Sequence, residues 1–222
     1  MLSEPEREAG EAPRFFPIAA SFYLALAVTG VVGLGLAHGR LRPELLADPG
    51  SWWTDVGLGL GAGALLLGLW ELARRLAAGA RKVERELGRL IGGLTRSEAA
   101  AIAVVSAVAE EVAFRGAFQT WIGWIPSALL FGALHLGPGR HFRWWSLWAL
   151  AGGLGLGLMV DQRGSLGAAI VAHLLVNAVQ LQRLRGRTLE PETNAVRETS
   201  AERPTEREEE IAEEAPREDG PE

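Results

Sequence analysis

The chain has 222 residues and a formal net charge of −5, from 22 Lys and Arg against 27 Asp and Glu, and 48% of its residues are hydrophobic. It contains no cysteine, which excludes disulfide bonds, a cysteine nucleophile and thiolate zinc sites. Apolar residues gather between about positions 15 and 181, whereas both ends are polar. We therefore expect a disordered segment over 1–14, one transmembrane domain over 15–186 and a disordered acidic tail over 187–222. The tail supplies most of the net charge, and nothing in the composition points to a nucleic-acid partner.

Six apolar segments are candidate membrane spans, because a helix needs about 20 such residues to cross the bilayer. The fourth contains Pro126 and stops at Gly137-Pro138-Gly139, which predicts a short or kinked helix. The predicted fold class is therefore all-α, a polytopic membrane protein. The six segments are Phe15–Ala37, Val56–Ala73, Glu98–Gln119, Trp121–Leu136, Trp144–Val160 and Ser165–Leu181.

One amphipathic stretch, Arg81–Leu94, separates the second and third segments. Its apolar residues recur at helical spacing and its other face carries Arg and Glu, which predicts a helix lying on the membrane surface. Thr95 and Glu98 then form a capping-box pattern, so the third span is expected to begin there.

Arginine and lysine crowd the connection between residues 74 and 96, whereas the connections on the opposite side carry few. Because cytoplasmic loops are enriched in these residues, the pattern predicts six spans with both termini in the cytoplasm. We expect an integral protein of a bacterial plasma membrane, with the lipid bilayer as its surroundings.

Glu110 and Glu111 lie side by side within the third apolar segment. Carboxylates are costly to place in lipid, so an intramembrane pair is a functional-site hypothesis. Arg115 follows Glu111 at i+4 and shares its helix face, which also fits a purely structural ion pair. Glu110 has no cationic partner at helical spacing, so we expect it to meet one on another helix or to hold a proton.

Two later segments add further polar residues. His173 and Asn177 are also spaced i, i+4, and His135 ends the fourth segment, four residues after Phe131. A histidine on an apolar helix is often only a satisfied core residue, but a His and Asn pair facing unpaired carboxylates favours a site. His38 and His141 lie beside arginines and are expected to be solvated.

Three known classes of intramembrane protease are disfavoured because the motifs of their active sites are absent from the sequence. The sequence has no His-Glu-x-x-His helix, no Gly-x-Ser-Gly turn within a span and no pair of intramembrane aspartates. The catalytic mechanism that remains is one in which a glutamate carboxylate acts together with histidines.

The three motifs Glu-Glu-x-x-x-Arg at 110–115, Phe-x-x-x-His at 131–135 and His-x-x-x-Asn at 173–177 occur in this order on successive predicted helices. Together they closely resemble the CPBP family of intramembrane proteases, which includes CAAX prenyl endopeptidases of the Rce1 type and bacterial Abi-type proteins. The resemblance covers about residues 95–181, the expected protease core.

The resemblance implies an intramembrane endopeptidase that cleaves a membrane-associated peptide or protein. It implies that Glu110 activates a water with help from His135, and that His173 and Asn177 steady the oxyanion. Glu111 and Arg115 would hold the geometry, with Phe131 beside them. The family is often called metalloprotease. Zinc is therefore a possible cofactor, with Glu110, His135 and His173 as its ligands, and a metal-free glutamate mechanism is the alternative.

Two other classes of function use the same buried polar residues. One is an ion or proton path in a transporter, although no internal repeat of the kind expected for transporters is visible. The other is a non-catalytic membrane regulator or immunity protein.

Overall fold

A computed structural model describes residues 15–39, 45 and 50–185, and this part of the chain is helical without strands. The segments predicted to be disordered, 1–14 and 187–222, lie outside the described residues. The elements in chain order are α1 (Phe15–His38), α2 (Trp52–Leu76), α3 (Ala78–Ile91), α4 (Arg96–Glu110), the π-helix η2 (Glu111–Phe118), α5 (Gln119–Ile122), α6 (Trp124–Leu134), the 3-10 turn η3 (Arg140–Phe142), α7 (Arg143–Arg163) and α8 (Gly167–Leu184).

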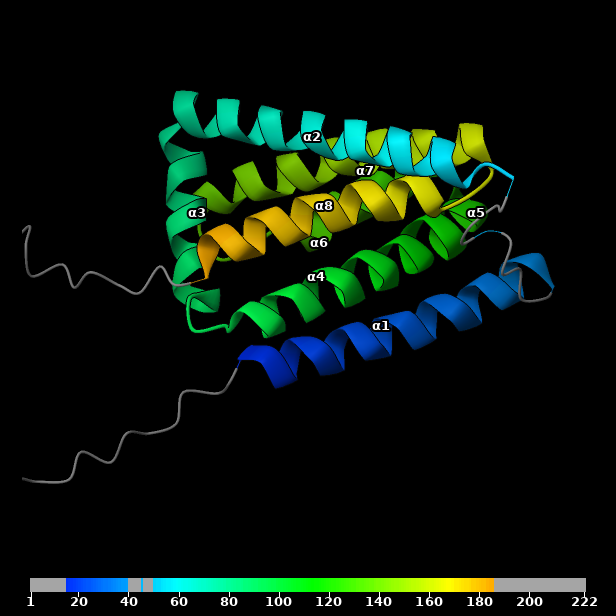
Figure 1. The fold of residues 1–222 in the computed structure, drawn as a ribbon, viewed down its shortest axis with the longest axis horizontal. Coiled ribbons are helices and arrows are strands. Elements are labelled where there is room, and N and C mark those ends of the chain that lie inside the picture. Colours follow the sequence, from blue (N-terminus) through cyan, green and yellow to red (C-terminus); the bar gives the residue numbers. More distant parts are fainter. Residues whose placement is uncertain (1–14, 40–44, 46–49, 186–222) are drawn as a thin grey trace, which may run out of the picture. The chain divides into compact units, whose positions relative to one another are not determined.

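The long helices lie side by side along a common direction, and α3 crosses them at one end (Figure 1). α1 begins and α8 ends at the end where α3 lies. Within the described residues, α1 and α2 are long and apolar enough to cross a membrane, with mean hydropathies of 2.0 and 1.7. Only 11% and 17% of their apolar windows are buried in the protein, so most of these side chains face outward.

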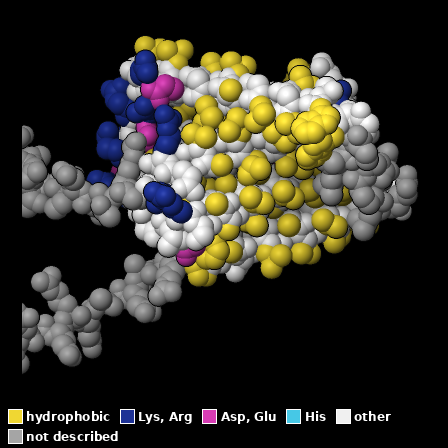
Figure 2. Space-filling view, in the orientation of Figure 1, with side chains coloured by type: hydrophobic (Ala, Val, Ile, Leu, Met, Phe, Trp, Pro, Cys, Tyr) yellow, Lys and Arg dark blue, Asp and Glu magenta, His cyan; other side chains and the backbone are white. Residues whose placement is uncertain are grey.

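The surface divides into an apolar body and a charged end. Figure 2 shows hydrophobic side chains over the middle of the visible face and Lys and Arg gathered at the end formed by α3. Exposed apolar side chains on helices long enough to span lipid, with most of the visible cations at one end, are the pattern of a helical membrane protein. The predicted all-α membrane fold is confirmed.

The amphipathic helix α3 forms as predicted, and its apolar stripe contacts protein. Val83 is fully buried in a cluster with Trp70 of α2, and Trp145 and Trp148 of α7 pack against that cluster. Glu84 on the same helix is buried and pairs with Arg74 of α2 at 3.3 Å. α3 therefore ties together the ends of the long helices.

Small residues bring two pairs of helices close together. A Cβ added at Gly30 of α1 would lie 2.9 Å from the backbone nitrogen of Ala113, and one at Gly33 would lie 2.9 Å from Ala117. α1 therefore runs parallel to the α4–η2 helix and nearly in backbone contact with it. α2 packs on α8 in the same manner, through Gly59. Such small-residue seams are typical of helix association in lipid.

The third predicted span is one continuous helical rod with a change of type inside it. The capping box at Thr95 and Glu98 starts α4 as expected, and the rod continues through η2 to the end of α5. The π-helix η2 was not predicted from the sequence. The fourth span, α6, is short as predicted, and Gly123 with a φ of 85° separates it from α5.

Candidate functional site

The glutamate pair lies where α4 changes into the π-helix η2, which begins at Glu111. A π-helix leaves backbone groups out of the α-helical pattern and recurs at functional sites. Here Ser127 of α6 donates its hydroxyl to the carbonyl oxygen of Phe114 at 2.9 Å. The altered backbone is thereby tied to α6, whose other end carries His135.

Glu111 is the centre of a buried ionic cluster. Its side chain is fully buried, and Oε1 accepts from Nη1 of Arg115 at 3.0 Å and contacts Nδ1 of His173 at 2.7 Å. The i, i+4 ion pair predicted from the sequence is present. The Arg115 guanidinium also lies 4.4 Å above the centre of the Phe131 ring, a cation–π contact that holds it against α6.

Glu110 approaches the same imidazole from the other side. Its Oε2 lies 3.6 Å from Nε2 of His173, and its residue is only 8% exposed. The two adjacent carboxylates therefore flank the two nitrogens of one histidine. The Tyr23 side chain of α1 also approaches this part of α4 and interacts with the Glu110 carboxylate.

Asn177 faces α4 through a different contact. Its Nδ2 donates to Oγ of Ser106 at 2.8 Å, and Ser106 is buried one turn before Glu110. The two polar residues of the predicted His and Asn face thus both meet the glutamate-bearing helix, which holds α8 in register with α4.

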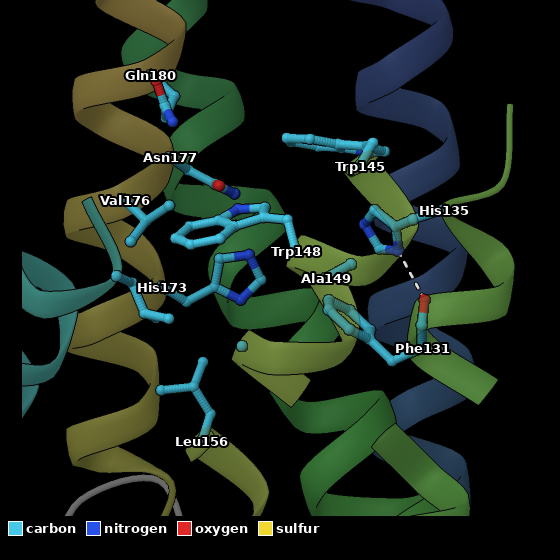
Figure 3. A pocket seen from close by; sticks show the side chains of 12 residues that line it. Phe131, His135, Trp145, Trp148, Ala149, Leu156, His173, Val176, Asn177 and Gln180 are labelled. Atoms are coloured by element: carbon cyan, nitrogen blue, oxygen red, sulfur yellow. Dashed lines mark hydrogen bonds between the residues drawn. The ribbon is translucent and has the colours of Figure 1, made fainter. Parts of the chain in front are cut away.

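His173 and Asn177 also line a cavity of about 60 Å³, whose opposite wall carries His135. Figure 3 shows the His173 and His135 rings on opposite sides of this space, with Trp148 and Ala149 of α7 between them. Nδ1 of His135 contacts the carbonyl oxygen of Phe131 at 2.7 Å. The other ring nitrogen, Nε2, takes no part in this hydrogen bond. Glu110 is not among the lining residues, and its nearest contact to the cavity wall is Nε2 of His173 at 3.6 Å. The remaining lining residues are Leu66, Trp145, Gly152, Leu156, Val176 and Gln180.

Within residues 15–39, 45 and 50–185, no group of three or more His, Asp and Glu side chains is arranged to hold a metal ion. Both nitrogens of His173 face carboxylates, and Phe131 lies beside His135, with their ring centres 4.5 Å apart. This donor arrangement does not fit the zinc site considered from the sequence, and the reaction proposed below uses side chains alone.

Two histidines differ from their predicted solvated state. His38 ends α1, is half-buried and borders a second cavity of about 350 Å³, together with Arg115 and Gln119. His141 is half-buried in the turn η3, and its Nε2 is enclosed without a hydrogen-bond partner in the described part of the chain.

Sequence reasoning missed several residues that shape the site. Tyr23 lies outside the three motifs, although a single tyrosine in an apolar helix is itself a signal of a polar contact. Ser106 and Ser127 each support a site helix through one hydroxyl, and small hydroxyl residues are too common in membrane helices to be singled out from sequence.

Comparison with known proteins finds a family model that matches the part of the chain carrying this site. Residues 94–179, from just before α4 to near the end of α8, match the family model described as Type II CAAX prenyl endopeptidase Rce1-like. The family resemblance drawn from the three motifs is thus confirmed over these residues. α1, α2 and most of α3 lie outside the match.

The chain is also 36% identical over 80 residues to a protein of Bacillus subtilis (strain 168) named Uncharacterized protein YpbD. The alignment covers 35% of this chain and 41% of that protein, so the chain spans less than half the length of this curated relative. No solved structure matches the chain.

Proposed function

We propose that the protein is an intramembrane endopeptidase that hydrolyses a peptide bond in a membrane-associated peptide or protein. One observation carries the proposal: the imidazole of His173 is held between two adjacent buried glutamates, on the wall of a cavity that Asn177 and His135 also line. The match to the Rce1-like family model, which contains all of these residues, supports the same reaction class.

Glu110 is the proposed general base. It takes a proton from a water molecule as that water attacks the substrate carbonyl, and it returns the proton to the leaving amine, so the proton balance closes on one carboxylate. His135, from the opposite wall, helps to orient the water. Positioned general bases typically contribute about 10²- to 10⁴-fold to a rate.

Glu111 and Arg115 are proposed to set the state of His173. A carboxylate only accepts hydrogen bonds, so Nδ1 of His173 donates to Glu111 at 2.7 Å. Two carboxylates and one guanidinium leave one negative charge in the buried cluster, which a protonated His173 balances. In that form Nε2 also carries a proton and can donate to developing charge.

Nε2 of His173 and the amide of Asn177 are the proposed oxyanion donors. Asn177 uses one N–H on Ser106, and the second remains for the substrate. Donors fixed in advance in a water-poor site are worth roughly 2.7–4 kcal/mol of barrier each. The contacts of His173 with Glu111 at 2.7 Å and of Asn177 with Ser106 at 2.8 Å hold the two donors in place.

The end with α3 and most of the visible arginines is proposed to face the cytoplasm of a bacterial cell, with both chain termini on that side. The cavity, lined mainly by α7 and α8 with His135 at the end of α6, would then open toward the cytoplasmic half of the bilayer.

The direct experiment uses purified protein in liposomes with a library of membrane-associated peptides, with and without prenyl groups, and mass spectrometry to find cleaved bonds. We expect wild-type protein to cut a subset of peptides and Glu110→Ala to cut none. Equal cleavage by both would show that the cleavage does not depend on this site and would overturn the proposed mechanism, whereas no cleavage by the wild-type protein would overturn the peptidase function.

One observation favours a second candidate, an ion or proton path. Arg115 borders the larger cavity, while His173, joined to it through Glu111, borders the smaller one. Charged groups thus link two cavities, as in a conduction path. A pH-gradient assay in sealed liposomes separates the two functions: proton flux that Glu110→Ala abolishes, without any peptide cleavage, would favour the path over the protease.

A further inference from the structure

Tyr23 brings α1 to the proposed catalytic base, although α1 lies outside the residues that match the family model. It is the single tyrosine of the 222-residue sequence. Its neighbours along α1 are apolar, and Phe22 beside it is 60% exposed on the outer face. Tyr23 by contrast is partly buried and turns toward α4.

The position of Tyr23 is fixed by the packing of α1. The seam of Gly30 on Ala113 and Gly33 on Ala117 holds α1 parallel to the helix that carries the glutamates. Two turns before Gly30, the Tyr23 ring packs against the buried cluster that includes Ile102 of α4. It also lines an apolar groove of about 300 Å³ between α1 and α4, next to Ala109.

A phenol hydroxyl in such surroundings requires a hydrogen-bond partner, because an unsatisfied polar group is costly away from water. The residue that follows Ala109 on this wall is Glu110, and its carboxylate is the charged group that interacts with the Tyr23 hydroxyl. The other neighbours of the ring in the groove and the cluster are apolar side chains.

We propose that Tyr23 is a positioning residue for Glu110: its hydroxyl donates a hydrogen bond to the carboxylate from α1, while His173 approaches that carboxylate from α8. The carboxylate is thereby held between two helices and cannot swing toward the apolar groove. α1 then contributes a residue to the active site, in addition to spanning the membrane. The catalytic consequence rests on the proposed peptidase function, whereas the hydrogen bond does not.

The hydrogen bond is tested without any substrate. Because the chain has one tyrosine, the tyrosine bands of its ultraviolet resonance Raman spectrum report one hydroxyl. We expect the bands of a strong donor in the wild-type protein, and a loss of that signature in Glu110→Ala, with Val108→Ala as a matched change on the same helix. Circular dichroism and gel filtration establish that each variant is folded, and Glu110→Gln, which keeps the side-chain shape, provides a second comparison. Identical tyrosine bands in the wild type and both Glu110 variants would overturn the proposal.

The catalytic consequence is tested with Tyr23→Phe, which removes only the hydroxyl. A hydrogen bond to a charged group corresponds to roughly a tenfold to hundredfold change in rate. We expect kcat to fall by that factor with KM nearly unchanged, and Val28→Ala, at a 57% exposed position of α1, to behave as wild type.

The two proposals fail in different ways. If wild-type protein cleaves peptides and Tyr23→Phe cleaves them at the same kcat, the positioning role is refuted and the peptidase function stands. If wild-type protein cleaves nothing, the peptidase function fails, and the Raman comparison still decides the hydrogen bond.

Discussion

Replacing Arg115 with methionine tests the buried ionic cluster on which the site geometry depends. Met keeps a similar length and fills most of the space, but it leaves Glu111 without its guanidinium partner at 3.0 Å. The side chains of this pair are only 2% and 0% exposed. Removing one member of such a pair costs about 3–5 kcal/mol, because a buried charge is left uncompensated. The lost contact over the Phe131 ring acts in the same direction.

The matched control is Arg89→Met on α3. Arg89 pairs with Glu86 at 3.1 Å, nearly the same distance, but these side chains are 44% and 31% exposed. An exposed pair contributes about 0.2–1 kcal/mol. The free energy of unfolding, measured by denaturant titration in mixed micelles, should therefore fall several times more for Arg115→Met than for Arg89→Met.

The double variant Glu111→Gln with Arg115→Met separates charge from packing. When Gln replaces Glu111, loss of the arginine no longer leaves an unpaired buried charge. The double variant should therefore lose less free energy of unfolding than the sum of the two single losses. Equal losses for Arg115→Met and Arg89→Met, or strictly additive losses in the cycle, would refute the view that this ion pair is a buried unit.

Three further outcomes are expected. Gly59→Ala should lower the free energy of unfolding by about 1–3 kcal/mol, because the new Cβ would lie 2.6 Å from the Ala168 carbonyl oxygen of α8, whereas Gly61→Ala, with open space around it, should be neutral or slightly stabilising; equal effects would contradict the close seam. Single cysteines in this cysteine-free chain at the exposed positions Lys82 and Arg140 should react with impermeant reagents from the cytoplasmic side, and one at Gly50 from outside; labelling of Lys82 from outside would reverse the orientation. Peptide cleavage should persist after chelation of divalent metals, and loss of activity restored by added zinc would require a metal mechanism.

Most of the fold was predictable because lipid imposes a simple pattern. Long apolar runs, the Thr95 capping box and the stripe of α3 each depend on local sequence alone, and each appears in the structure. The π-helix was not predictable in this way. Its existence depends on tertiary contacts such as that from Ser127 to the Phe114 carbonyl oxygen, which no local pattern encodes.

The site was predictable as a set of residues and less so as a geometry. Spacing along one helix identified the Glu111 and Arg115 pair, which is present. Which carboxylate would meet His173 depends on the rotation of α8 against α4, and sequence periodicity does not fix that rotation. In the structure Glu111 has the closer contact, at 2.7 Å against 3.6 Å for Glu110. Tyr23 was missed for the same reason, because its partner lies on another helix.

The most direct test of the central claim is the rate of peptide hydrolysis by Glu110→Gln, measured on any peptide that the wild-type protein cleaves. Gln keeps the size and most hydrogen bonds of Glu110 but cannot take a proton from water. We predict that kcat falls by about 10²- to 10⁴-fold while the free energy of unfolding stays close to that of the wild type. A folded Glu110→Gln variant that cleaves the peptide at the wild-type rate would contradict the assignment of Glu110 as the base.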